Sequence, residues 1–415
     1  MFQFCRILGK YIGYVLIGLM LIFPYKYQGI KAILLFLLLL SPFFQRKETI
    51  VVSKKLLIWG YVYVFSNLFS ICYGVFLSNP APYVYVLIYC LWPLIFVYLT
   101  LLISKSYFYS LISCMRYCLF VILIMGIFAF LMFNLTLMKE GEILGYDATI
   151  RPGFPFIAIS GGAVTSVIFL YFFFFSLFLV TRKLVKLDWI NITLGVFYIF
   201  FTSRRVIFLN FFLAFFFVFL LIRFLNQNKR TELITVYKKK VGFMFFILSI
   251  IVVFSLFYGL VDFEAIGDFL DNTIGNDNND PRIAQFESLI AGWVEKPLLG
   301  NGTGVNASVI RSDIPGTYEL SYIAMLFERG IIGMLIFVTQ YLILMFWSIQ
   351  GLKKSIVECR YVLSLIVAVN LFMIANATNP YLGAFDHIWF LFLPIVIINL
   401  SKDNKNENLC LNKSL

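Results

Sequence analysis

Long apolar runs separated by short polar segments dominate this chain of 415 residues. Apolar runs of about 17 to 25 residues are long enough to cross a bilayer as helices, which satisfy their backbone groups internally. The pattern predicts about twelve spans, of which the second, seventh and twelfth are short. The predicted spans are residues 7–23, 30–44, 56–77, 83–103, 112–133, 154–180, 187–202, 206–224, 241–261, 319–349, 361–379 and 385–400. We therefore expect an all-α, polytopic integral membrane protein, with residues 1–415 forming a single membrane domain.

Two polar stretches interrupt the apolar pattern and predict outer loops. The smaller covers residues 134–153 and the larger covers residues 262–318. Within the larger loop, "PRIAQFESLIAGWVEKP" has a proline in its first turn, apolar residues at helical spacing and a proline at its end, so it predicts a short amphipathic helix. Long loops on a membrane scaffold commonly carry function.

The composition and the charge distribution support this topology. The chain is 61% hydrophobic and 13% charged, with a formal net charge of +12. If the predicted spans are correct, 23 of the 33 Lys and Arg residues fall on one side, which is the pattern of cytoplasmic loops. We therefore expect both termini in the cytoplasm and the two long loops outside, and we interpret the charge as topology rather than as a nucleic-acid surface.

Six arginines are not explained by this topology. Arg204 and Arg205, in "FTSRRVIF", lie at an outer boundary beside the start of the next helix, where free N–H groups favour an anion. Arginine also matches phosphate oxygens in pairs. The alternative is that these side chains extend to lipid headgroups. The six are Arg151, Arg204, Arg205, Arg282, Arg311 and Arg329.

The stretch "YELSYIAMLFERGIIGMLIF", residues 318–337, places charges in an apolar segment. If residues 319–349 form one helix, then Glu319, Tyr322 and Arg329 share a face about 80° wide, while Glu328 points to the opposite side. Charges at membrane depth usually face a cavity or a partner, so we expect the polar face to line a water-filled site open to the outside. The alternative for Glu319 is a helix cap in solvent.

Two further polar features have plainer explanations. His387, the single histidine, follows Asp386 in the last outer loop and is interpreted as an interface residue rather than a catalyst. The small residues of "ISGGAVTS", residues 159–166, suit close helix packing in a membrane. Cys114 and Cys118 lie one helical turn apart without a nearby histidine, so the sequence predicts no metal site and no cofactor there.

These features resemble the O-antigen polymerase and O-antigen ligase superfamily. The resemblance rests on the span count, on the Ser-Arg-Arg at an outer boundary, and on "DPRIAQFESLIAGWVEKPLLGNGTG" followed by "YELSYIAMLFERGIIGMLIF". It covers residues 150–350 well and the first half of the chain only through span count and hydropathy. Ligases of the superfamily typically carry a histidine where this chain has Glu319, so the resemblance favours the polymerase.

The resemblance implies a metal-independent glycosyltransferase of the bacterial inner membrane that joins repeat units carried on undecaprenyl diphosphate at the outer face. Its implied partners are the lipid-linked oligosaccharide, membrane lipids and a chain-length regulator, and no nucleic acid. We expect Arg204, Arg205 and Arg282 to hold the diphosphate and Glu319 to accept the acceptor proton. Arg151, Arg311, Tyr322, Trp293 and Arg329 are expected to bind substrate, with Trp293 against sugar.

A transporter or flippase of lipid-linked oligosaccharides is the alternative from another class, because it also needs basic residues in an apolar chain. Many transporters show two matched halves with interrupted helices, and this sequence does not show them. The two classes differ in where the unexplained arginines lie. A flippase requires a central cavity reached from both sides, whereas an enzyme of this kind needs a site at one side.

Overall fold

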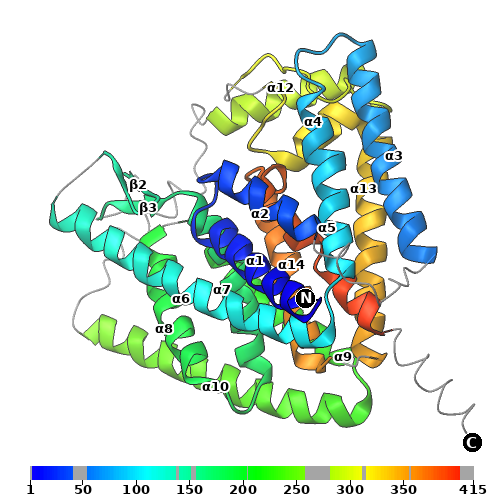
Figure 1. Ribbon diagram of the computed structural model, residues 1–415. Helices are drawn as coiled ribbons and strands as arrows, with labels where there is room; N and C mark the ends of the chain where they lie inside the picture. The colour runs from blue at the N-terminus through cyan, green and yellow to red at the C-terminus, as the bar shows by residue number, and fades with distance from the viewer. Residues whose placement is uncertain are drawn as a thin grey trace, which may run out of the picture.

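The structure is a computed structural model that describes residues 2–40, 54–136, 140–150, 156–202, 204–257, 281–310, 315–354 and 357–401. It is mostly helical (Figure 1). Each predicted span coincides with a helix over at least part of its length. The helices are α1 (Phe2–Ile22), α2 (Gln28–Leu40), α3 (Lys54–Phe76), α4 (Val84–Val86), η2 (Leu87–Leu91), α5 (Trp92–Leu101), α6 (Lys105–Leu135), α7 (Gly162–Val180), α8 (Lys186–Thr202), α9 (Arg205–Arg223), α10 (Gln227–Phe257), α12 (Pro281–Glu295), α13 (Ser321–Lys354), α14 (Cys359–Asn376), η3 (Tyr381–Gly383), α15 (Phe385–Ile388) and η4 (Trp389–Phe392).

Seven of the described helices are long and apolar enough to cross a membrane. They are Lys54–Phe76, Val84–Leu101, Lys105–Leu135, Gly162–Val180, Arg205–Arg223, Ser321–Lys353 and Cys359–Asn376. Three predicted spans coincide with shorter apolar helices at Gly9–Ile22, Gln28–Leu40 and Phe385–Ser401. The chain is therefore a polytopic membrane protein by the length and composition of its helices, and the count of twelve crossings stays a prediction.

Consecutive helices alternate in direction, so their connections gather at two ends. At one end, named here the sheet end, the turn after α1 contacts the segment after α14 through Tyr25 N–H to Asp386 Oδ2, 2.8 Å. At the other end, the Tyr109 hydroxyl accepts from Glu358 N–H at 3.2 Å. This second end, named the basic end, carries many of the cations that were predicted to be cytoplasmic: Lys105, Arg182, Lys183, Lys186, Arg223, Lys229, Lys353 and Arg360.

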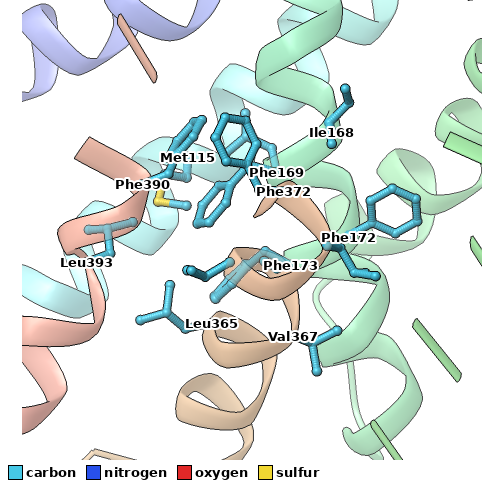
Figure 2. Close-up of a cluster of buried hydrophobic side chains, with 14 of the residues drawn as sticks. Met115, Ile168, Phe169, Phe172, Phe173, Leu365, Val367, Phe372, Phe390 and Leu393 are labelled. Carbon is cyan, nitrogen blue, oxygen red and sulfur yellow. The ribbon is translucent and has the colours of Figure 1, made fainter. Parts of the chain in front are cut away.

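Helix α7 is the centre of the molecule. Every residue of α7 from Ala163 to Val180 is buried, as expected for a helix that is hydrophobic on all sides. It packs most extensively against α14 and also contacts α6, α8, α9 and α10. Figure 2 shows the core between these helices, where the rings of Phe169 and Phe390 stack at 4.0 Å and Phe372 meets Phe390 edge-on at 5.1 Å. The predicted helix-packing role of "ISGGAVTS" is confirmed in part, since Gly162 begins α7 and a Cβ there would meet Tyr25 and Pro24.

A small antiparallel sheet occupies part of the smaller predicted loop, which the all-α prediction did not include. Its strands are β1 (Glu142–Ile143), β2 (Tyr146–Thr149) and β3 (Ala158–Ser160), in the order β1-β2-β3. Leu144 and Gly145 connect β1 and β2 with positive φ at both residues, the conformation of a tight hairpin turn. Strand β3 also shortens the span predicted at 154–180, because α7 begins only at Gly162. The Tyr146 hydroxyl anchors the sheet to α6 by donating to Ile122 O at 2.9 Å.

Candidate active site

Glu319 and Arg282 lie together at the sheet end, although 36 residues separate them along the chain. Arg282 Nε is 2.7 Å from Glu319 Oε2, and both side chains are partly exposed. Arg282 comes from the first turn of α12, which begins at Pro281 as the sequence predicts. Glu319 lies two residues before α13 begins at Ser321, so the predicted placement of Glu319 in the first turn of that helix is wrong.

Gln285 fixes the backbone on which Glu319 sits. Its side chain is fully buried, and its Oε1 accepts from the backbone N–H of Glu319 at 3.2 Å and of Leu320 at 3.4 Å. Gln285 follows Arg282 by three residues on α12, so the same helix face presents both contacts. The position of the carboxylate is therefore set by α12, and the sequence did not single out Gln285.

Helix α13 is broken at Gly330, where the sequence predicted one continuous helix over 319–349. Gly330 has φ 61° and ψ −172°, a conformation that only glycine adopts readily. The backbone N–H groups after the break leave the helix and donate to another segment: Ile331 to Pro297 O at 2.9 Å and Ile332 to Leu298 O at 3.2 Å. The prediction that Glu319 and Arg329 share a face of one continuous helix over 319–349 is therefore wrong, because Glu319 precedes α13 and the helix is interrupted directly after Arg329.

The carbonyls before the break are satisfied by the same segment. Phe327 O accepts from Asn301 N–H at 2.9 Å, and Glu328 O accepts from Gly302 N–H at 2.8 Å. In a regular helix these carbonyls would bond the N–H groups of residues 331 and 332. Residues 297–304, named here the inserted segment, thus replace two helix bonds with four bonds, which satisfy two carbonyls and two N–H groups at the break.

The glycines of the inserted segment allow this close approach. A Cβ on Gly300 would lie 2.5 Å from Gly330 N, and a Cβ on Gly330 would lie 2.2 Å from Leu298 O. On its other side the segment bonds to α3, where Thr303 N–H donates to Ser70 O at 3.2 Å. The glycine-rich turn therefore connects α13 with α3.

Glu328 and Arg329 are both buried next to the break. Glu328 Oε1 accepts from Gly304 N–H at 3.2 Å, so this carboxylate holds the end of the inserted segment. Arg329 Nη1 donates to Asn67 Oδ1 on α3 at 2.5 Å, and its guanidinium lies over the ring of Tyr89 at 4.4 Å. Of the charged residues in the apolar stretch 318–337, Glu319 therefore pairs with Arg282, while Glu328 and Arg329 are buried inside the protein.

The loop between the inserted segment and Glu319 is held by Tyr318. Its hydroxyl donates to Val305 O at 2.9 Å and accepts from Ala307 N–H at 2.6 Å. Burial raises the pKa of Tyr318 to about 12, so the hydroxyl stays protonated at physiological pH and keeps both bonds. Phe327 contacts this ring edge-on and also packs against Gly292, which connects the loop, α12 and α13 into one wall.

Arg204 and Arg205 begin α9 at the sheet end, as predicted. Arg204 precedes the helix and donates from Nη1 to the Tyr381 hydroxyl at 2.6 Å, while Arg205 is exposed in the first turn. The Nε of Arg204 is buried and has no hydrogen-bond partner within the described residues. Helix α14 packs against both α9 and α13 and so lies between them. Among the described residues, Arg204 and Arg205 are therefore separated from Arg282 and Glu319.

The remaining predicted site residues fall into two groups. Tyr322 is partly buried and its hydroxyl donates to Met373 O on α14 at 2.6 Å, so it connects two helices. Trp293 is partly exposed near the end of α12 and its Nε1 donates to Pro297 O at 3.1 Å. Arg151 and Arg311 lie outside the described residues. All substrate-binding roles of these residues stay predictions.

A buried polar cluster at the sheet end was not predicted. Lys31 and Asp386 are almost fully buried and form an ion pair at 2.7 Å. Asp386 also accepts from Gln28 Nε2 at 3.1 Å, which ties α2 to α15. His387 is fully buried beside it, with Nε2 at 3.2 Å from the Ser166 hydroxyl, so the prediction of an interface residue is wrong. The one sequence feature that could have indicated this cluster is Lys31, a charged residue within the apolar run 30–44.

The comparisons with known proteins concern the part of the chain that contains Arg204, Arg205, α12 and the beginning of α13. Residues 190–338 match the family described as O-antigen ligase. The match includes Arg204, Arg205, α12, the inserted segment and the break in α13, and it confirms the resemblance to the O-antigen polymerase and ligase superfamily. A search of curated proteins found no match. Residues 190–338 of this chain are therefore similar to a family whose description is O-antigen ligase.

Proposed function

We propose that this enzyme is the polymerase of a bacterial surface polysaccharide. It transfers a growing glycan from undecaprenyl diphosphate to a hydroxyl of a second lipid-linked repeat unit at the outer face of the inner membrane. The observation that carries the proposal is the Arg282–Glu319 pair, a cation and a carboxylate held in contact at the sheet end. The superfamily match supports the reaction class, and the glutamate at position 319 in place of the ligase histidine supports the polymerase branch.

The pair supplies the two groups that this transfer needs. The acceptor oxygen attacks the anomeric carbon, the bond from that carbon to the diphosphate oxygen breaks, and the acceptor proton passes to a carboxylate. Glu319 is the proposed proton acceptor. The leaving diphosphate gains negative charge, and a guanidinium is suited to bind it in a bidentate manner. Because no metal is proposed, Arg282, Arg204 and Arg205 carry this electrostatic role.

Their contact in the structure also indicates how substrate engages the pair. Arg282 and Glu319 keep side-chain exposures of 49% and 31%. Ion pairs this exposed contribute only about 0–1 kcal/mol, so a diphosphate can displace the carboxylate from Arg282 at low cost. Displacement would release Glu319 Oε2 from Arg282 at the moment the donor is bound.

The product of a defined reaction tests this proposal. Purified enzyme is given undecaprenyl-diphosphate-linked repeat units alone, or together with lipid A–core. We expect a ladder of polymer lengths with repeat units alone and no glycan on lipid A–core. Transfer to lipid A–core without a ladder would overturn the polymerase and support the ligase, which is the second candidate because the matched family carries that description.

A further inference from the structure

An apolar groove of about 700 Å³ runs between α3 and α13. Residues 61–70 and Tyr73 of α3 form one wall, and the part of α13 after the break forms the other. Large side chains that are exposed at membrane depth flank it, with Tyr61, Phe65 and Phe69 more than half exposed on the α3 side. The groove is therefore open laterally toward the lipid, and its lining suits a hydrocarbon chain.

Arg329 is the one charged residue among the described residues that line this groove. Its side chain is only 9% exposed, and its Nε is buried with no hydrogen-bond partner. Its Nη1 donates to Asn67 Oδ1 and its guanidinium lies over the ring of Tyr89, so the rest of the group is held against the groove wall. Charged residues at membrane depth usually face a ligand, a cavity or an ion path.

The groove also reaches the wall of the candidate active site. Leu299 of the inserted segment lines it together with Arg329. The next residues of that segment bond to the carbonyls of Phe327 and Glu328, directly below the loop that leads to Glu319. The end of a lipid that lies beside Leu299 and Arg329 would thus be close to the loop that carries Glu319.

We propose that this groove binds the isoprenoid chain of a polyprenyl phosphate lipid, with Arg329 toward the phosphate-bearing end. The choice of a polyprenyl lipid rests on the proposed function, in which both donor and acceptor carry such a chain. The groove offers one apolar channel and one cation, which fits an amphiphile with a single chain and an anionic head. Phospholipids carry two chains and are expected to bind less tightly.

Filling the groove tests the chain site. Ser66 is half-buried in the lining, and its hydroxyl bonds only Tyr63 O of its own helix, so Ser66→Trp places a ring in the groove. Ile58→Trp is the matched control, because Ile58 is exposed on the same helix outside the lining. Native mass spectrometry with undecaprenyl phosphate as the probe should show at least about a tenfold loss of affinity for Ser66→Trp and less than about twofold for Ile58→Trp.

The role of Arg329 is tested with a pair of lipids that differ in charge. The unmodified protein should bind undecaprenyl phosphate at least about tenfold more tightly than undecaprenol, and Arg329→Gln should remove this preference. A merely structural arginine would change both affinities together. If Arg329→Gln fails to fold, the preference of the unmodified protein and the Ser66→Trp result still decide the question.

The outcomes separate this inference from the proposed function. Unchanged binding in Ser66→Trp, equal binding of phosphatidylglycerol and undecaprenyl phosphate, or no preference for the phosphate over the alcohol would each overturn the groove assignment, whether or not the enzyme forms polymer. Conversely, a filled groove that abolishes lipid binding in a protein that makes no polymer would support the groove and contradict the polymerase.

Discussion

At the scale of single residues, the sequence singled out several charged side chains but did not predict how they are arranged. Arg282 and Glu319 were assigned separate tasks, and the structure brings them within 2.7 Å of one another. Their contact depends on Gln285 and on the folding of a loop of more than thirty residues, neither of which has a local sequence signal. Glu328 was expected on the opposite face of the helix without a specific role, and in the structure its Oε1 accepts from Gly304 N–H.

The arginines give a prediction at this scale. Arg205→Ala and Arg282→Ala should each abolish polymer while the protein stays in the membrane, and Lys at either position should restore little activity because a point charge does not reproduce a bidentate fork. Polymer length in cells, with membrane content measured by immunoblot, is the readout. Normal polymer from both alanine variants would mean that these side chains only reach to lipid headgroups.

At the scale of elements, hydrophobic periodicity located the helices well and their internal breaks poorly. The short helix in the larger loop was predicted at 281–297 and is found at Pro281–Glu295. The break in α13 was not predicted, because residues on both sides of Gly330 continue the apolar pattern of one helix. The motifs "PLLGNGTG" and "FERG" are far apart in the sequence, but their backbones form hydrogen bonds with each other at the break. Hydrophobic periodicity does not report such a long-range contact.

This arrangement predicts a sharp difference between two glycines. Gly330→Ala should destabilise the protein by roughly 3 kcal/mol or more, because alanine is strained at this φ and ψ and its Cβ would overlap Leu298 O. Gly60→Ala on α3 meets nothing within 4 Å and should be neutral or slightly stabilising. Thermal unfolding of the two purified variants in one detergent measures the difference, and equal melting temperatures would show that the break is not required.

At the scale of the whole molecule, the loop and charge pattern predicted the two ends of the bundle. Many of the cations assigned to the cytoplasm lie at the basic end, whereas Arg204, Arg205 and Arg282 lie at the sheet end. This one-sided distribution favours an enzyme over a flippase. Span number was harder to predict, because several apolar runs form helices shorter than a full crossing, and the small sheet was missed because its strands are only two to four residues long.

The orientation of the two ends is a prediction in its own right. Lys239 lies on α10 next to Lys240, whose Nζ donates to Thr181 O at the basic end. A reporter tag after Lys239 should therefore be cytoplasmic, and a tag after Asn278, in the larger loop, should be periplasmic. Reporters on the same side of the membrane would remove the outer-loop assignment and, with it, the proposed location of the reaction.

If the Arg282–Glu319 pair performs the transfer, the Glu319→Gln variant should lose most of the reaction rate. Purified Glu319→Gln is compared with the unmodified enzyme on undecaprenyl-diphosphate-linked repeat units, with Glu295→Gln, an exposed glutamate at the end of α12, as the matched control. Glutamine keeps the shape of the side chain but cannot accept the proton, so the initial rate of ladder formation should fall by about 10² to 10⁴. Glu295→Gln should react at the normal rate. If Glu319→Gln forms ladders as fast as this control, Glu319 is not the proton acceptor. The next residue to test as the base is then Glu287, another glutamate of α12.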